Sequence, residues 1–294
     1  MNDAAPQETG PQIARVGVIG GGLMGSGIAE VVARAGLDVI VVEASPGAAD
    51  MARERIEGSL HRAEERGKID AAGVAEVLGR IRTTADIDGV ADRDLVVEAA
   101  TEHEQTKLEL FARIGQIVES DEAILVSNTS SIPIVKLAAV SGRRERVMGV
   151  HFFNPAPVMK LVELIPCLAT SPETLAAMRA FVSDSLGKQP IEATDRAGFV
   201  VNSLLVPYLL SAIRMYEAGY ASADDIDRGM VLGCGHPMGP LALSDLIGLD
   251  TIRAIGVSMY EEFKEPLFSP PPLLDRMVEA GLLGRKSGQG FHRY

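Results

Sequence analysis

The sequence has few cysteines, a deficit of basic residues and no long hydrophobic run, and each shortage excludes a class of protein. Two cysteines, Cys167 and Cys234, form neither a disulfide framework nor a metal-ligand spacing, so we expect a reducing cytoplasm and no metal site. Lys and Arg number 28 against 40 Asp and Glu, a net charge of −12. This argues against nucleic-acid binding, because phosphate backbones require a basic surface. No apolar run approaches the roughly 18 residues of a membrane helix, so no membrane span is expected.

The chain start also lacks the features of a targeting signal. Residues 1–14, "MNDAAPQETGPQIA", are polar, with neither a basic start nor an apolar stretch. We expect a disordered tail there and not a signal peptide. The remaining length is enough for about two domains.

Two regions with different periodicity follow the tail. Strand-like runs that alternate with helix-like runs predict an α/β domain at 15–196. The strand-like runs are 14–20, 37–44, 94–100, 123–128, 146–153, 160–165 and 189–194, and the helix-like runs are 22–36, 104–118 and 171–187. Beyond residue 196 only helical periodicity is found, at 199–219, 222–233, 241–263 and 271–281. This predicts a smaller, all-helical domain at 197–294.

A glycine-rich turn between the first strand and the first helix predicts a dinucleotide site. "GVIGGGLMGSG" contains Gly20, Gly22 and Gly25 at the spacing that allows a tight turn, a close approach of pyrophosphate and close helix packing. Leu23 and Met24 lie between the last two of these glycines, where the helix N-terminus offers its amides to phosphate. Glu43 ends the second strand, eighteen positions after Gly25, and can accept hydrogen bonds from ribose hydroxyls. This favours NAD over NADP; the alternative is a glycine turn with an unrelated surface glutamate.

A scarce histidine ends one of the later strands. His151 opens "HFFNPAPVMKLVE", which closes on Glu163 in the next strand, and the Asn154-Pro155 turn between them should bring that strand back. A carboxylate on one imidazole nitrogen fixes the tautomer and raises the basicity of the other. The pair therefore fits the proton transfer that accompanies hydride transfer to NAD. The alternative is a packed core histidine.

Long motifs in a fixed order resemble one family, the short-chain L-3-hydroxyacyl-CoA dehydrogenases, and among them the bacterial 3-hydroxybutyryl-CoA dehydrogenases. They are "VGVIGGGLMGSGIA", "SNTSSIPI", "GVHFFNPAPVMKLVELI", "DRAGFVVNSLLVPYLLSAI", "DIDRGMVLGCGHPMGPLALSDLIGLDT" and "GRKSGQGFHRY". The resemblance covers about residues 14–294. It implies a doubly wound, mostly parallel Rossmann-type sheet with a helical second domain, an acyl-CoA substrate and a homodimer formed through that second domain.

The resemblance also implies a role for individual residues. His151 corresponds to the general base and Glu163 to its orienting partner, while Ser130 and Asn202 correspond to polar contacts with the substrate. Three further residues correspond to positions near the cofactor: Glu102, Lys107 and Asn128. Taken alone, Ser130 would also suit a helix N-cap, Asn202 a buried helix polar residue and Lys107 a solvated helix lysine.

Two features depart from the family pattern. Glu43 stands where the family often has aspartate, which keeps the charge on a longer side chain, and the basic residues that hold the CoA phosphates do not align. Periodicity offers one substitute: Arg55, Ser59, Arg62 and Arg66 form a basic stripe beside an apolar stripe of Ile56, Leu60 and Ala63. We expect Arg62 to contact CoA phosphate; the alternative is a solvated helix face balanced by neighbouring glutamates.

Three other functions compete with the CoA-thioester enzyme. Dehydrogenases of free 3-hydroxy acids share the glycine-rich start but use a catalytic lysine, and no matching lysine motif is found in the helical domain. A non-enzymatic cofactor-binding protein would not need His151, Ser130, Glu163 and Asn202 together. The sequence does not distinguish an enzyme that acts on carrier-protein thioesters from one that acts on CoA thioesters.

Overall fold

The structure is a computed structural model, and it describes residues 13–294. The expected disordered tail therefore lies almost wholly outside the described residues. The described chain divides into two compact units, one ending at Asp195 and the other spanning Arg196–Tyr294.

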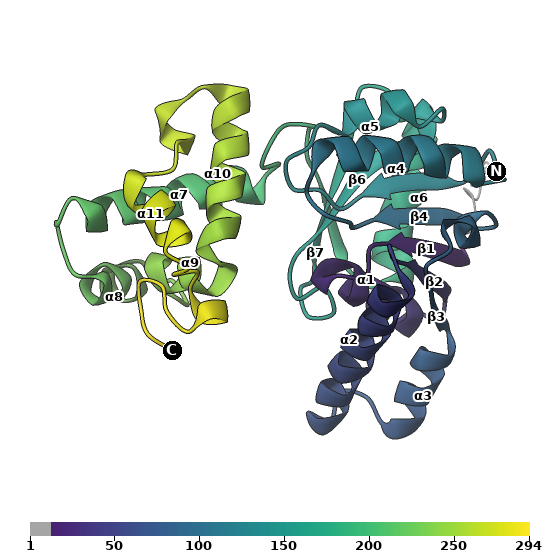
Figure 1. Cartoon of the computed structure of the whole chain (residues 1–294), viewed down its shortest axis with the longest axis horizontal. Coiled ribbons are helices and arrows are strands. Elements are labelled where there is room, and N and C mark those ends of the chain that lie inside the picture. The colour runs from purple at the N-terminus through teal and green to yellow at the C-terminus, as the bar shows by residue number, and fades with distance from the viewer. Residues whose placement is uncertain (1–12) are drawn as a thin grey trace, which may run out of the picture. The chain divides into compact units, whose positions relative to one another are not determined.

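The first unit is built on one eight-stranded sheet (Figure 1). Its strand order is β3-β2-β1-β4-β5-β6-β7-β8, and all neighbours are parallel except β6 and β7, which are antiparallel. The first six strands thus have the order of a doubly wound dinucleotide-binding sheet, in which the order of strand addition reverses between β1 and β4. The strands are β1 Arg15–Ile19, β2 Asp38–Val42, β3 Ile81–Thr84, β4 Leu95–Glu98, β5 Ile124–Ser127, β6 Val147–Phe152, β7 Leu161–Pro166 and β8 Gln189–Glu192. The predicted fold class is confirmed.

The helices of this unit begin where the sequence supplies caps. Ser45 caps α2 and Ser171 caps α6, each through its hydroxyl, and a proline occupies the first turn of both helices. The α-helices are α1 Leu23–Arg34, α2 Pro46–Glu65, α3 Ala71–Gly79, α4 Glu104–Ile117, α5 Ile134–Val140 and α6 Pro172–Ala180. A π-turn, Phe181–Ser185, extends α6, and short 3-10 turns lie at Ile87–Val90 and Arg144–Arg146.

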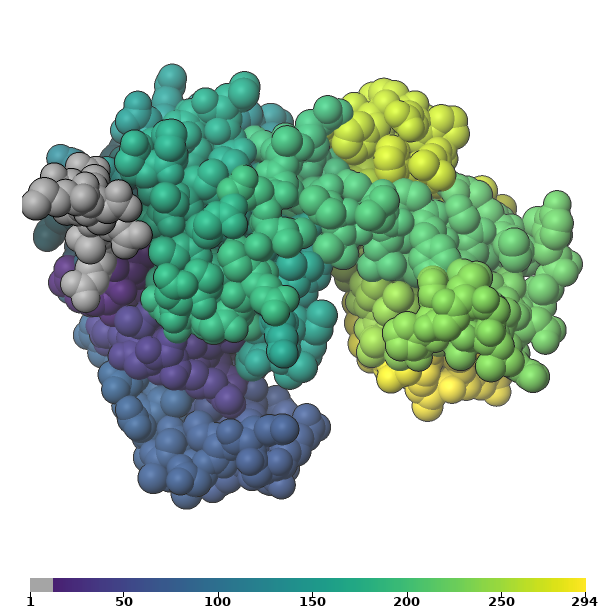
Figure 2. All heavy atoms as spheres, turned by 180° about the vertical axis from the view of Figure 1, so that it is seen from behind, coloured from purple at the N-terminus to yellow at the C-terminus, as the bar shows by residue number. Residues whose placement is uncertain are grey.

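Helices α2 and α3 form a projection from the edge of the sheet. Figure 1 shows both helices extending away from β2 and β3, and Figure 2 shows residues of about this range as a separate blue lobe. Ile56 and Leu60 of α2 are fully buried in the core of the unit, together with Val16, Val18 and Val41 of the strands. The apolar stripe of α2 therefore anchors the base of the lobe, and its other faces remain available.

Three elements of the first unit were absent from the sequence expectation, namely β3, α3 and the seven-residue helix α5. β3 is an edge strand in which Arg82 is exposed and Thr83 and Thr84 are half-buried, so it has no apolar run by which to recognise it. α3 begins at an Asp70 cap, and only Val74 and Val77 are buried. Such short, half-exposed elements are fixed by their neighbours and not by their own pattern.

The second unit is helical, as predicted. Its core gathers Leu209, Leu210, Ile213, Leu241 and Met259 from three helices. The expected helical run 241–263 is two helices, because Gly248 takes a φ of +102° that ends the first of them. The helices are α7 Val201–Glu217, α8 Ala223–Cys234, α9 Pro240–Ile247, α10 Leu249–Phe263 and α11 Pro272–Glu279, with 3-10 turns at Pro266–Phe268 and Arg285–Ser287.

Two kinds of structural feature are absent from residues 13–294. No helix in this range is both long and apolar enough to cross a membrane. The same residues contain no group of three or more His, Cys, Asp or Glu side chains placed to hold a metal ion.

Candidate functional site

The glycine-rich turn leaves open space in front of the first helix. Gly20 follows β1 with a φ of +92°, and a Cβ there would lie 2.8 Å from the backbone of Ala100. A Cβ on Gly25 would lie 1.7 Å from the carbonyl oxygen of Gly20, so the helix can approach the strand only with glycine at that position. Nothing lies within 4 Å of a Cβ on Gly22. Two glycines are thus required by packing, and the third keeps a space clear for a ligand.

The first turn of α1 faces this space with unsatisfied amides. Gly22 is the N-cap and supplies no side-chain cap, and no acidic residue lies in the first turn. Leu23 and Met24 therefore present backbone N–H groups and the positive end of the helix dipole. These features are what a pyrophosphate requires.

Glu43 lies beside the glycine turn, just beyond the end of β2. Its carboxylate accepts hydrogen bonds from the amide of Gly21 at 2.6 Å and from its own neighbour Ala44 at 3.2 Å. Arg55 of α2 donates to the carbonyl oxygen of Gly21 at 3.1 Å. The carboxylate is thus held at the turn, in the position from which a ribose hydroxyl can donate to it.

A buried ionic network lies beyond β4. Lys107 is only 1% exposed, and its Nζ donates to both carboxylate oxygens of Glu98, at 2.7 and 2.9 Å. Ser127 donates to the same carboxylate at 2.6 Å. The alternative of a solvated helix lysine is therefore wrong. Glu98 was not predicted from the sequence, although an acidic residue at the end of a buried strand could have indicated it.

Glu102 links this network to Ser130. Its Oε2 lies 3.4 Å from Nζ of Lys107, and its Oε1 accepts from the amide of Ser130 at 3.0 Å and from the hydroxyl of Thr129. Burial acts to raise the pKa of Glu102, but Lys107 and these hydrogen bonds outweigh it and hold the pKa below the ordinary value. Glu102 is therefore a carboxylate at neutral pH.

His151 and Glu163 face each other across the antiparallel pair β6 and β7. They are direct partners in the strand register, and Nδ1 of His151 lies 2.8 Å from Oε2 of Glu163. Glu163 is fully buried and His151 nearly so. In neutral histidine this contact places the proton on Nδ1, so that Nε2 is the basic nitrogen.

Two neighbours fix the end of β6. Asn128, just after β5, accepts from the amide of Phe152 at 2.9 Å. Phe153 packs edge-on against the imidazole of His151, with ring centroids 4.7 Å apart. Asn128 therefore supports the histidine through the backbone.

Asn202 belongs to the second unit. It is the second residue of α7 and is buried. The structure brings His151 together with Glu163, and Ser130 with Glu102. It describes Asn202 only within its own unit, and the substrate contact of Asn202 stays a prediction.

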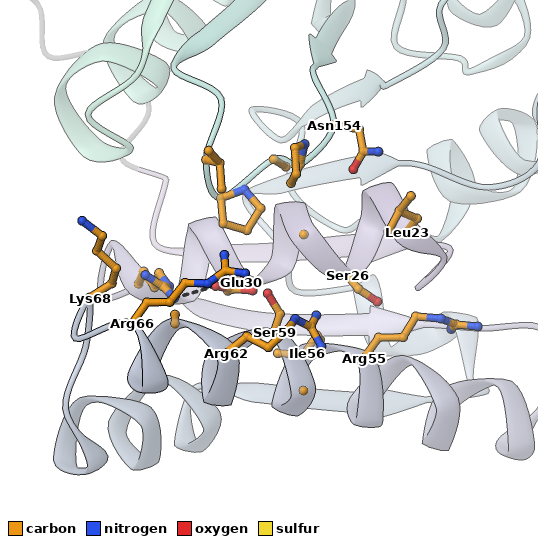
Figure 3. Close-up of a pocket in the computed structure, with 18 of the residues that line it drawn as sticks. Leu23, Ser26, Glu30, Arg55, Ile56, Ser59, Arg62, Arg66, Lys68 and Asn154 are labelled. Atoms are coloured by element: carbon orange, nitrogen blue, oxygen red, sulfur yellow. Dashed lines mark ion pairs between the residues drawn. The ribbon is translucent and has the colours of Figure 1, made fainter. Parts of the chain in front are cut away.

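A cavity of about 940 Å³ lies between α1, α2 and the loop that joins β6 to β7 (Figure 3). Its lining includes all four residues of the predicted basic stripe, Arg55, Ser59, Arg62 and Arg66. With Arg34 and Lys68 the lining holds five cations, against the two carboxylates Glu30 and Glu54. An acidic protein thus has one locally basic pocket in this unit.

The ion pairs of α2 leave two arginines of this pocket, Arg62 and Arg66, available. Within residues 13–294, the carboxylates of α2 pair with Arg53 and His61, through Glu57 and Glu64. No carboxylate pairs with Arg62 or Arg66 in that range. This weighs against a balanced, solvated helix face.

The glycine turn, the helix N-terminus and the buried His–Glu pair on one doubly wound sheet define an NAD-dependent oxidoreductase. The family model of the 3-hydroxyacyl-CoA dehydrogenase NAD-binding domain matches residues 15–196, and that of the 3-hydroxyacyl-CoA dehydrogenase C-terminal domain matches residues 198–294. The chain belongs to the 3-hydroxyacyl-CoA dehydrogenase family.

Several relatives are similar over nearly their whole length. A 3-hydroxybutyryl-CoA dehydrogenase of Mycobacterium tuberculosis is 54% identical over 282 residues, covering 96% of this chain and 99% of the relative. The mitochondrial hydroxyacyl-coenzyme A dehydrogenase of Sus scrofa is 43% identical, covering 96% and 91%. Among solved structures, M. tuberculosis FadB2 aligns with a TM-score of 0.95 at 54% identity, covering 96% and 99%. PaaH1 of Ralstonia eutropha, an (S)-3-hydroxybutyryl-CoA dehydrogenase, aligns with a TM-score of 0.90 at 45% identity, covering 96% and 99%.

Proposed function

We propose that this enzyme interconverts (S)-3-hydroxybutyryl-CoA and acetoacetyl-CoA, with His151 as the general acid and base. The observation that carries the proposal is the 2.8 Å contact between Nδ1 of His151 and the buried carboxylate of Glu163. The pair stands at the carboxyl edge of the parallel strands, where ligands of doubly wound sheets bind. The names of the two bacterial relatives described above supply the four-carbon acyl group.

The proton is handled by His151. In oxidation, Nε2 of the neutral imidazole takes the proton of the 3-hydroxyl group, and in reduction the imidazolium returns it to the forming alkoxide. Acceptance and return of hydride at C3 is the chemistry that NAD supplies when bound. Glu163 stabilises the imidazolium by its charge and holds the ring in place, without being protonated itself.

Ser130 and Asn202 are the proposed contacts to the substrate oxygens. Ser130 lies in the turn after β5, and its amide and hydroxyl both donate to Oε1 of Glu102. These hydrogen bonds fix its position and support the proposed contact. Asn202 belongs to the helical domain at 197–294, in which it is the buried second residue of α7. Both would position the substrate, while His151 transfers the proton.

The residues at the glycine turn fit NAD. Gly22 leaves the space that a pyrophosphate would fill, and the amides of Leu23 and Met24 would hold it. Glu43 would accept from the ribose hydroxyls and repel a 2′-phosphate. Glu102, with Lys107 behind it, and Asn128 would border the nicotinamide side.

The basic cavity would hold the CoA part of the substrate. Arg62 and its stripe offer planar forks of donors, which suit phosphate. Arg62 is exposed and lines the cavity without a carboxylate partner in the described chain. Carrier-protein thioesters would not need this cavity, since they lack the adenosine phosphates.

We also propose a homodimer formed through the helical domain, in the cytoplasm. Apolar side chains of α7 and α8 support the dimer, since Leu204 is 75% and Leu232 is 76% exposed. Both cysteines are free thiols, which suits a reducing compartment.

A steady-state assay tests the function. NADH oxidation is followed with acetoacetyl-CoA and with longer 3-ketoacyl-CoAs, then with NADPH in place of NADH. We expect the highest kcat/KM with NADH and acetoacetyl-CoA. A preference for an acetoacetyl carrier protein, or for a free 3-keto acid, would overturn the proposal.

A further inference from the structure

The loop of residues 153–160 has two functions in the proposed site. It joins β6, which carries His151, to β7, which carries Glu163, and its residues Asn154–Val158 form one wall of the basic cavity (Figure 3). Its own hydrogen bonds are few: the amides of Val158 and Met159 both donate to the carbonyl oxygen of Pro155. The position of the wall must therefore be fixed from outside the loop.

Lys188 supplies that fixed point. It precedes β8 and is 8% exposed, and its Nζ donates to the carbonyl oxygens of Ala156 and Met159, at 2.7 Å each. Its backbone is itself anchored, because its amide donates to Val182 at 3.0 Å. The next residue donates to the carbonyl oxygen of Lys160 at 2.8 Å. The ammonium group thus joins both halves of the loop to the edge of the sheet.

This cation is unusual in its partners. Among the described residues no carboxylate pairs with it, and burial lowers the pKa of Lys188. A buried charge without a counter-ion persists only when well-directed dipoles solvate it. The two carbonyl groups fill that role, so the loop cannot move away without leaving the ammonium unsolvated. The loop thus stabilises the ammonium group, and the ammonium group stabilises the position of the loop.

We propose that Lys188 is a positioning residue: it holds the 153–160 loop in place as the wall of the CoA cavity. The inference rests on the proposed function, because it takes the cavity to be the CoA site. Pre-ordering the wall removes a loop-ordering penalty from substrate binding. The benefit should reach only ligands that extend into the cavity.

The test compares two thioesters in Lys188→Met, which keeps the length of the side chain and removes its donors. We expect KM for acetoacetyl-CoA to rise about tenfold, the size expected when loop ordering must accompany binding. KM for acetoacetyl-N-acetylcysteamine and for NADH should change less than about twofold. Lys188→Arg, which keeps a cation and its donors, should recover part of the loss. The matched control is Lys136→Met, an exposed lysine paired with Glu104 on α4.

Hydrogen–deuterium exchange gives a second measurement, and its first part uses only the wild-type enzyme. In the free wild-type enzyme the amides of Val158 and Met159 should exchange slowly, and in Lys188→Met they should exchange faster until CoA is added. Fast exchange of this loop in the free wild type would overturn the inference, even if the variants fail to fold. Equal rises of KM for both thioesters would overturn it too. An inactive wild type would instead refute the proposed function.

Discussion

In the proposed mechanism His151 and Glu163 contribute unequally to proton transfer. The imidazole would contact the reacting oxygen, whereas the carboxylate, which is buried and lies 2.8 Å from Nδ1, would act only through the imidazole. Removing each residue should therefore have a different kinetic effect.

His151→Gln should lower kcat by about two to four decades, the usual contribution of general acid–base catalysis. NADH binding should change little, because the glycine turn is untouched. Stopped-flow and steady-state measurements of NADH oxidation check both values. Near wild-type kcat would make His151 a structural residue.

Glu163→Gln should reduce kcat less than His151→Gln and should shift the pH–rate profile. In the proposed mechanism the wild-type carboxylate stabilises the imidazolium by its charge, so its loss should move the corresponding limb of the profile to lower pH. An unshifted limb would show that Glu163 does not act through the imidazole.

At Glu43 the prediction concerns cofactor choice. Glu43→Ser removes the carboxylate that accepts from Gly21 and faces the ribose position. We expect kcat/KM to fall with NADH and to rise with NADPH, so that the ratio of the two values moves closer to one. A wild-type preference for NADPH would contradict the assignment directly.

The role of a single residue could be predicted from the sequence where the residue lies within a motif of known chemistry. His151 and Glu163 lie in consecutive strands joined by one short loop, so chain order made their meeting a reasonable prediction, and the register of β6 and β7 brings it about. Lys188 and Lys107 were not predictable in the same way. Their partners are two backbone carbonyl groups and Glu98, and only the folded sheet brings these within reach.

Among the elements, α1 carries a buried charge pair. Glu30 is fully buried and makes no hydrogen bond through either carboxylate oxygen, while Nη2 of Arg34 lies 2.7 Å away on the next turn, at 29% exposure. The pair is therefore held by its charges and not by a hydrogen bond. Replacing one partner should destabilise the protein more than replacing both partners by apolar residues.

Arg34→Met should destabilise the protein by about 3 kcal/mol, because it leaves an uncompensated buried carboxylate. The double variant Glu30→Met with Arg34→Met should recover most of that loss, since an apolar pair replaces a buried ion pair at little net change. Urea unfolding measures both. Lys136→Met on the exposed pair with Glu104 is the control, with a change of about 0–1 kcal/mol. Additive single-variant losses would contradict the coupling.

α2 carries the predicted basic stripe into the cavity. Arg62→Ala should raise KM for acetoacetyl-CoA and leave KM unchanged for NADH and for acetoacetyl-N-acetylcysteamine. The difference should shrink at high salt, because screening weakens exposed phosphate contacts. If the wild type binds both thioesters with equal KM, the stripe is a solvated face.

The elements followed from the sequence in proportion to their burial. β1, β2, β4 and β5 are buried and read as apolar runs. β3 and α3 were missed because their side chains are half-exposed, and their place is set by β2 and α2. The break between α9 and α10 depends on the backbone angle of Gly248, which the apolar periodicity of the two helices conceals.

For the molecule as a whole, we predict a dimer in solution. Leu204→Glu combined with Leu232→Glu replaces an exposed apolar side chain on each of α7 and α8 by a charge and should shift the enzyme toward the monomer. Size-exclusion chromatography with light scattering measures the mass. The matched control is Leu168→Glu, which alters a 99% exposed leucine of the first unit. A monomeric wild type, or an unshifted variant, would refute the helical interface.

The β6–β7 register has a consequence for how this enzyme tolerates insertions and deletions. His151 and Glu163 meet because they are opposite partners in an antiparallel ladder, in which side chains alternate between faces. One inserted residue between Leu161 and Glu163 would turn the carboxylate to the other face of the sheet and leave Val162 or the inserted residue opposite the histidine. Additional residues between the strands would leave the pair intact and alter only the cavity wall. Natural variation in length should therefore accumulate in the loop, where it changes which thioester fits, and be absent from the two strands.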